Sequence, residues 1–117
     1  MTVRRIVANL AADDPGRARA FYEELLDLKV VMDQGWILTF ASEASAPPQL
    51  SVASEGGSGT PVPDLSVEVD DVDEVYRRAK SADLDITYDI ADEPWGVRRF
   101  YVRDPNGRTL NILSHSE

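Results

Sequence analysis

The sequence predicts an α+β protein in which two β-α-β-β-β modules form a single domain. The 117 residues fit one domain. Two helix-forming segments each follow a strand-like run, and short β-rich runs follow each helix. The halves repeat this order: aligned on Asp14 and Asp71, each places a leucine at the exit of its helix, 14 and 13 residues downstream.

The first module, about residues 1–54, opens with an expected strand at 6–12. Asp14 can cap a following helix and Pro15 suits its first position, so we expect the helix to begin there and to end near residue 27. One apolar stripe should face the core, and its members are Ala18, Phe21, Tyr22 and Leu25. Strands are then expected at residues 28–32, 35–41 and 49–53, with a turn at 33–35.

A connector at residues 55–63 has the Gly, Ser and Pro content of a flexible linker. The second module, about residues 62–117, opens with an expected strand at 65–69, and Asp71 then begins a helix with an aspartate variant of the capping box. Its apolar stripe consists of Val72, Val75, Tyr76 and Ala79. Strands are expected at residues 84–89, 98–103 and 108–113, and the turn at 104–107 joins the last two into a hairpin.

The composition indicates the cellular compartment of the protein and excludes some kinds of binding partner. The absence of cysteine excludes disulfides and cysteine-bound metals, so we expect a cytoplasmic protein. A formal charge of −9 repels phosphate backbones and anionic membranes, which argues against nucleic acid and membrane partners. No apolar run approaches the roughly 18 residues of a membrane span, and the first residues lack the pattern of a secretory signal, so no targeting segment is expected.

Alternation along the strands separates two sheet faces. Leu65, Val67 and Val69 belong to an aliphatic face suited to lie beneath the helices, and the same pattern assigns Ile6, Ala8 and Leu10 to it. The opposite face collects Asn9, Gln49, Ser51, Asp64, Ser66, Glu68 and Asn111. A polar sheet face can simply meet water, but two such faces from one short chain favour a concave polar cleft for a small organic ligand.

Three segments, at residues 13–26, 67–73 and 93–107, together resemble the vicinal oxygen chelate superfamily, which includes glyoxalase I, extradiol dioxygenases and bleomycin-resistance proteins. The segments include Phe21-Tyr22, Asp70-Asp71 and Asp104-Pro105-Asn106-Gly107. The resemblance covers nearly the whole chain. It implies a curved mixed sheet around a cleft. In bleomycin-resistance-like members it also implies a homodimer, often with modules exchanged between chains.

The resemblance also implies four positions where metal-using members place their ligands. By spacing, these positions are Val7, Gln49, Asp64 and Asn111. Val7 has no donor atom, and Asn111 offers a neutral carbonyl where a carboxylate would hold a divalent ion. A hard cation held by oxygen donors stays open as an alternative, although one charge among three donors predicts weak binding. We therefore expect no metal and no other cofactor.

Aromatic residues around the cleft are implied by the resemblance to stack on planar ligand groups, and Trp95 and Tyr101 suit this role. Packing of the loop onto the sheet is an equally good explanation of Trp95. Arg98 and Arg99 can orient an anionic ligand or pair with surface acids, and the second is commoner. His115, the only histidine, is expected to be a solvated tail residue.

The expected ligand-binding residues are thus Asn9, Gln49, Asp64, Glu68, Trp95, Tyr101 and Asn111. The leading hypothesis is a metal-independent small-molecule-binding protein of the bleomycin-resistance type, which sequesters its ligand. One alternative is a glyoxalase-like lyase or isomerase, or a dioxygenase, with an atypical oxygen-donor metal site. Others are a metal-free catalyst with Asp64 or Glu68 as base, and a module that only binds other proteins.

Overall fold

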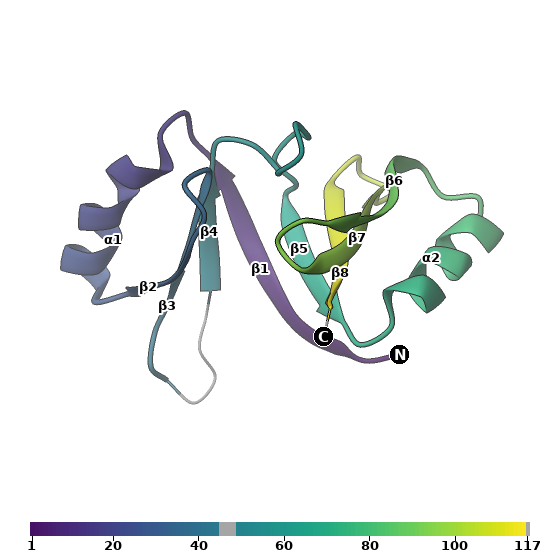
Figure 1. The fold of residues 1–117 in the computed structure, drawn as a ribbon, viewed down its shortest axis with the longest axis horizontal. Coiled ribbons are helices and arrows are strands. Elements are labelled where there is room, and N and C mark those ends of the chain that lie inside the picture. The colour runs from purple at the N-terminus through teal and green to yellow at the C-terminus, as the bar shows by residue number, and fades with distance from the viewer. Residues whose placement is uncertain (45–48, 117) are drawn as a thin grey trace. The chain divides into compact units, whose positions relative to one another are not determined.

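The computed structural model of the protein describes residues 1–44 and 49–116 and has the predicted α+β class (Figure 1). The chain divides into two compact units. The N-terminal unit is Val7–Val62, and the C-terminal unit is Met1–Ile6 together with residues 63–116. Strand β1 (Val3–Ala11) contributes residues to both units.

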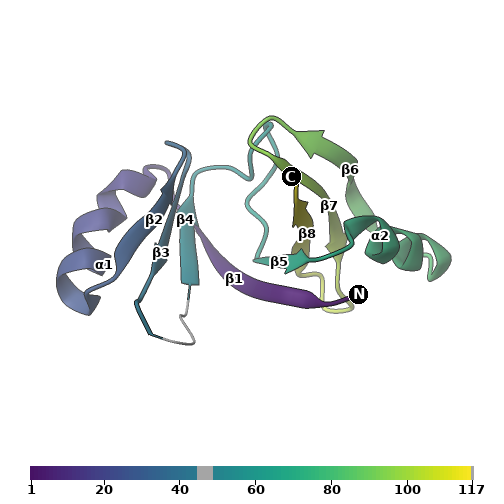
Figure 2. The ribbon, with the colours of Figure 1, turned by 60° about the horizontal axis from the view of Figure 1, so that its bottom comes forward.

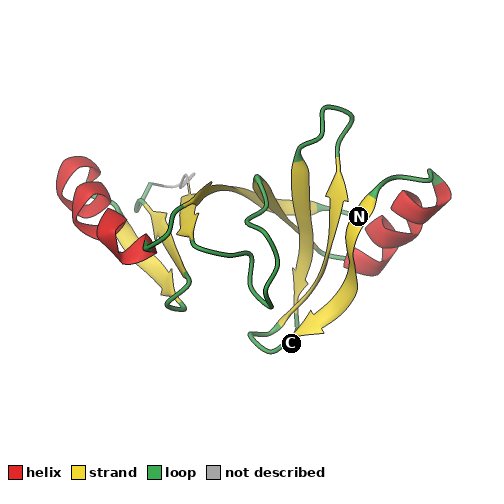
Figure 3. Cartoon of the chain, turned by 90° about the horizontal axis from the view of Figure 1, so that it is seen from above, coloured by secondary structure: helices red, strands yellow, loops and turns green. Residues whose placement is uncertain are grey.

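The N-terminal unit has one helix, which lies on one side of its strands (Figure 3). Its elements after β1 are a 3₁₀ turn η1 (Pro15–Ala18), helix α1 (Arg19–Leu26) and strands β2 (Lys29–Asp33), β3 (Ile37–Ala41) and β4 (Gln49–Ala53). Strand β1 pairs in parallel with β4, whereas β4 with β3 and β3 with β2 are antiparallel. The predicted β-α-β-β-β order of this module is confirmed.

The core of the N-terminal unit lies between the helix and its sheet. Leu38, Phe40 and Val52 are buried there. The ring of Tyr22 lies 5.2 Å from that of Phe40, centroid to centroid, and Ala18 also packs on this cluster. The predicted helix stripe is therefore half right, since two of its four members reach the core.

The other two stripe residues, Phe21 and Leu25, are 58% and 64% exposed, which contradicts the prediction. Strand β1 shows the same departure, because Ile6, Ala8 and Leu10 are exposed and the intervening Val7 is buried. The physical reason is that α1 packs chiefly on β2, while η1 contacts β3 and β4. One short helix does not cover the whole width of the sheet.

The C-terminal unit repeats the pattern with α2 (Val72–Ser81) packed on β7 and β8 (Figure 2). Its other elements are β5 (Leu65–Val69), β6 (Ile86–Glu93), β7 (Val97–Arg103) and β8 (Thr109–His115). Strand β5 is parallel to β8, and the β8–β7 and β7–β6 pairs are antiparallel. Phe100 is fully buried beneath α2 among Val67, Val69 and Ile112, and the helix contributes Val72 and Ala79 as predicted.

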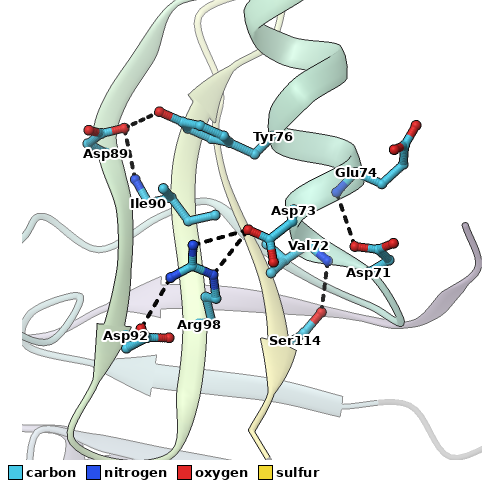
Figure 4. A network of polar contacts seen from close by, with 10 residues as sticks. All are labelled: Asp71, Val72, Asp73, Glu74, Tyr76, Asp89, Ile90, Asp92, Arg98 and Ser114. Atoms are coloured by element: carbon cyan, nitrogen blue, oxygen red, sulfur yellow. Dashed lines mark hydrogen bonds and ion pairs between the residues drawn. The ribbon is translucent and has the colours of Figure 1, made fainter.

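Polar contacts hold the start of α2 in place (Figure 4). Asp71 Oδ1 accepts a hydrogen bond from the backbone N–H of Glu74 at 3.1 Å, which confirms the predicted cap. Ser114 Oγ accepts from the backbone N–H of Val72 at 3.1 Å and donates to the carbonyl of Val69 at 2.8 Å. By contrast, Asp14 stands at the N-cap of η1 without any capping bond from its side chain, so that prediction is wrong.

A second set of contacts ties α2 to β6 and β7 (Figure 4). Arg98 donates to Asp73 on the helix and to Asp92 on β6. The hydroxyl of Tyr76 donates to Asp89 at 2.5 Å. This bond raises the pKa of Tyr76 and lowers the pKa of Asp89. The helix is thus held on its sheet by its apolar stripe and by the polar contacts of Asp73 and Tyr76.

The predicted turns are confirmed. Asp33 accepts from the backbone N–H of Gly35, whose φ of +82° suits a residue without a side chain. Asp104 accepts from the backbone N–H groups of Asn106 and Arg108. The connector is a hydrogen-bonded loop, in which Thr60 Oγ1 donates to the carbonyl of Gly57 at 2.7 Å.

Within the described residues, neither α1 nor α2 has the length and apolar character that a membrane-spanning helix needs.

The two aspartates at the helix starts form a matched pair for experiment. We expect Asp71→Ala to lower the free energy of unfolding by about 1 kcal/mol, because the cap to Glu74 is lost. Asp14→Ala should change it by only a few tenths of a kcal/mol, since its side chain makes no capping bond. Urea unfolding of the two variants measures the difference, and equal losses would contradict the assignment.

Candidate functional site

Each unit carries a polar row on the sheet face opposite its helix, which we call the helix-free face. In the N-terminal unit the row crosses β1, β4 and β3, and its cross-strand neighbours are Asn9, Ser51 and Thr39. In the C-terminal unit the row crosses β5, β8 and β7, and its members are Ser66, Asn111 and Tyr101. The rows are equivalent, since Asn9 and Ser66 each stand five residues before the aspartates used to align the halves.

The row of the N-terminal unit is closed by a bond between hydroxyls. Thr39 Oγ1 and Ser51 Oγ lie 2.8 Å apart, and both residues are buried. Asn9 and Gln49, both predicted to bind ligand, are half-buried on this face. The three side chains of this row, Asn9, Ser51 and Thr39, are neutral donors and acceptors.

Asn111 occupies the centre of the row in the C-terminal unit. Its neighbours Leu110 and Ile112 belong to the core under α2, so its own side chain lies on the helix-free face. The residue is 7% exposed. Its Nδ2 donates to Ser66 Oγ at 3.2 Å, whereas its buried Oδ1 has no hydrogen-bond partner among the described residues. A buried carbonyl without a donor is destabilising by about 1–3 kcal/mol.

A buried ion pair lies on the same unit between β6 and β7. The side chains of Arg99 and Glu93 are only 3% and 4% exposed. Their closest atoms, a guanidinium nitrogen and Glu93 Oε2, are 2.8 Å apart, and Arg99 Nε donates to the same oxygen at 3.1 Å. The hydroxyl of Tyr88 donates to Glu93 Oε1 at 3.0 Å, so both carboxylate oxygens have donors.

Three aromatic rings surround the Arg99 guanidinium. The ring centroids of Tyr88, Trp95 and Tyr101 lie 5.2, 5.0 and 5.1 Å from its central carbon. At this distance each ring face attracts the cation. Trp95 is therefore packed onto the sheet by Arg99, which is one of the two roles expected from the sequence. Trp95 and Tyr101 thus both contact the same cation, the Arg99 guanidinium of the C-terminal unit.

The sequence analysis expected Arg99 to pair with a surface acid, and it did not predict that the pair is buried or that Glu93 and Tyr88 take part in it. Arg98 and Arg99 were considered together, yet the structure separates them: Arg98 is half-buried beside α2, and Arg99 is buried on the opposite face. The alternation of side chains along β7 could have separated the two arginines. Arg99 shares a sheet face with Tyr101, and Arg98 shares the other face with Phe100.

Glu68 also lies on the helix-free face but is already paired. It contacts Arg5 at 2.8 Å and His115 Nδ1 at 2.9 Å. Burial pushes the pKa of Glu68 upward, but the hydrogen bond from His115 and the charge of Arg5 outweigh it, so the pKa is lowered overall. His115 is thus the last residue of β8 with a defined contact, contrary to the expected solvated tail. Its neighbour Ser114 caps α2, so the two do not form a catalytic pair.

The four positions implied for metal ligands offer a poor donor set. Val7 is a buried aliphatic residue, and Asn111 is a neutral amide bonded to Ser66. Asp64 Oδ2 accepts from the backbone N–H of Thr109 at 2.9 Å, and its other oxygen lies 4.0 Å from Arg108. Across the described ranges, 1–44 and 49–116, no three His, Cys, Asp or Glu side chains are grouped as a metal site requires.

The adjacent arginines provide a second matched pair. Arg99→Met should lower the free energy of unfolding by about 3–5 kcal/mol, because it leaves the Glu93 carboxylate buried without its partner. Arg98→Met should cost less than about 1 kcal/mol, since its ion pairs are exposed to water. Chemical denaturation distinguishes the two, and a similar small loss for both would show that the buried pair is not needed.

Solved structures confirm the fold assignment. A protein described as an NAD-dependent benzaldehyde dehydrogenase from Legionella pneumophila is 19% identical with a TM-score of 0.76, and the match covers 96% of this chain and 100% of that one. A superfamily member from Vibrio splendidus 12B01 is 17% identical with a TM-score of 0.68, covering 97% and 99%. Methylmalonyl-CoA epimerase from Mycobacterium tuberculosis is 17% identical with a TM-score of 0.64, covering 98% and 88%. At these identities the likeness concerns the fold alone.

Among curated proteins, none matches the sequence. The family model described as the glyoxalase/bleomycin resistance protein/dioxygenase superfamily matches residues 5–112. The match spans both modules and includes the segments on which the resemblance was based. The chain therefore belongs to the glyoxalase/bleomycin resistance protein/dioxygenase superfamily.

Proposed function

We propose that this protein binds a small organic molecule on its helix-free sheet faces without a metal ion, as a sequestering protein of the bleomycin-resistance type. Membership of the superfamily leaves both catalysts and binding proteins open, so the proposal depends on the site residues. The observation that carries it is the buried Oδ1 of Asn111, for which the described part of the chain offers no hydrogen-bond donor.

Asn111 Oδ1 is an acceptor held in a fixed orientation, because the Nδ2 of the same amide is bound to Ser66. A ligand that donates an N–H or O–H to this oxygen would remove the cost of leaving it unsatisfied. Trp95, which is half-buried, supplies aromatic surface in the same unit. Tyr101, the cross-strand neighbour of Asn111, is only 2% exposed and lies behind it against Arg99. The proposed ligand is therefore a planar molecule that carries a hydrogen-bond donor.

Metal independence is supported by the chemistry of the donor positions. Transition metals in proteins favour imidazole and thiolate ligands, and Val7, Gln49, Asp64 and Asn111 supply neither. The one carboxylate among them is half-exposed and accepts a backbone hydrogen bond from Thr109. These residues do not fit a divalent transition-metal ion.

The rival function, a glyoxalase-like lyase or isomerase or a dioxygenase, would need the Asp64 carboxylate to hold a metal or a carboxylate to act as base. A general base works best when its pKa lies near the operating pH. The contacts of Glu68 with His115 and Arg5 move its pKa in the opposite direction, which makes it a weaker base. Binding without turnover is therefore the function we favour.

We further propose that the protein works as a cytoplasmic homodimer. The resemblance to bleomycin-resistance-like members supports the dimer, and the cysteine-free composition supports a reducing compartment.

Single-tryptophan variants test the proposed function. Trp36→Phe leaves Trp95 as the only indole, and Trp95→Phe leaves Trp36. Both variants are titrated, with EDTA present throughout, against a library of planar aromatic amides, amines and phenols. We expect a ligand from this library to quench the fluorescence of Trp95 in the first variant saturably and the fluorescence of Trp36 in the second variant much less. Asn111→Leu should weaken that binding about tenfold, as expected for the loss of one hydrogen bond. Binding that requires added metal, or no binding at all, would contradict the proposal.

A further inference from the structure

Helix α1 presents an apolar surface to solvent in the N-terminal unit. Phe21 and Leu25 are more than half exposed, and together with Ala20 and Glu24 they line a shallow depression on the helix. Neighbouring exposed apolar side chains on a soluble protein commonly mark an interaction surface.

Two opposite charges belong to this segment, Glu24 within the depression and Arg17 in the turn before the helix. Arg17 and Glu24 are seven residues apart. Since η1 (3₁₀) runs directly into α1, this separation is about two turns and brings the two residues close to the same side. Neither side chain forms an ion pair with any residue in the described part of the chain. The middle of the interval falls between Ala20 and Phe21, a small and a large residue.

We infer that α1 is a contact between two copies of this chain, crossing antiparallel about a two-fold axis at Ala20 and Phe21. In this arrangement Arg17 of each copy contacts Glu24 of the other. The same ion pair therefore forms twice, as the two-fold symmetry of an isologous interface requires. The small side chain of Ala20 leaves room for the Phe21 ring of the second copy. The opposed helix dipoles also favour the antiparallel direction.

The second copy is the occupant that this pattern fits. Arg17 and Glu24 lie at equal distances on either side of Ala20 and Phe21, so the segment is complementary to a second copy of itself in the antiparallel direction. Binding of a different protein would not explain this symmetric spacing. The chain carries a net charge of −9, so two copies repel unless opposite charges are brought together at the contact. The inference rests on the homodimer proposed above and identifies the surface that forms it.

Sedimentation velocity over a range of concentrations tests the interface. We expect the wild type to be a dimer and Phe21→Glu to weaken the dimer by at least about 100-fold, because a charge replaces an apolar side chain at the centre of the contact. Leu84→Glu is the matched control, since Leu84 is 50% exposed but lies in the C-terminal unit. It should leave the dimer unchanged. Circular dichroism confirms that both variants are folded.

Charge reversal separates a specific contact from a general loss of stability. Arg17→Glu alone and Glu24→Arg alone should each weaken the dimer, and the double variant should restore it, because the two ion pairs are formed again with opposite sign. A wild-type dimer that Phe21→Glu leaves intact, or a double variant no better than the single ones, would overturn this interface but not the homodimer. A monomeric wild type would overturn both. The proposed ligand binding is tested separately, with the single-tryptophan variants, and none of these dimer results decides it.

Discussion

The polar face of the C-terminal unit depends on the buried ion pair between Arg99 and Glu93. Neither charge is stable out of water without the other, so the pair requires β6 and β7 to hold their register at this point. The same guanidinium gathers the rings of Tyr88, Trp95 and Tyr101 around it. The aromatic wall of the proposed site is thus positioned by a charge that the ligand itself does not need to contact.

The two modules use one scaffold for different surface chemistry. At equivalent register the N-terminal unit closes its row with a hydroxyl pair, Thr39 and Ser51. In the C-terminal unit, no described residue donates to the Oδ1 of Asn111. Repetition of the module explains why both rows exist, and the residues at each position decide what the row can bind. The two halves of this chain therefore differ in surface chemistry through a few strand positions on a repeated fold.

Local sequence signals predicted most elements because their causes are local. Asp33-Gln34-Gly35 and Asp104 to Gly107 form the expected turns, since their bonds involve residues two to four apart. Burial was harder to predict. Helical spacing shows that Phe21 and Leu25 share a side of α1, but only the packing of α1 on β2 shows that this side is uncovered. The buried partner of Arg99 was not predicted for a similar reason, because Glu93 is brought close to it by the β6–β7 pairing.

Metal-independent binding is the central claim of this account, and the metal content of the purified protein tests it most directly. Wild type and Asp64→Ala would be dialysed against Mn²⁺, Ni²⁺ and Zn²⁺, freed of unbound ions and measured by inductively coupled plasma mass spectrometry. The account predicts far less than one equivalent of any metal in both proteins, because the four donor positions supply one carboxylate and no imidazole. One equivalent in the wild type that Asp64→Ala loses would contradict it.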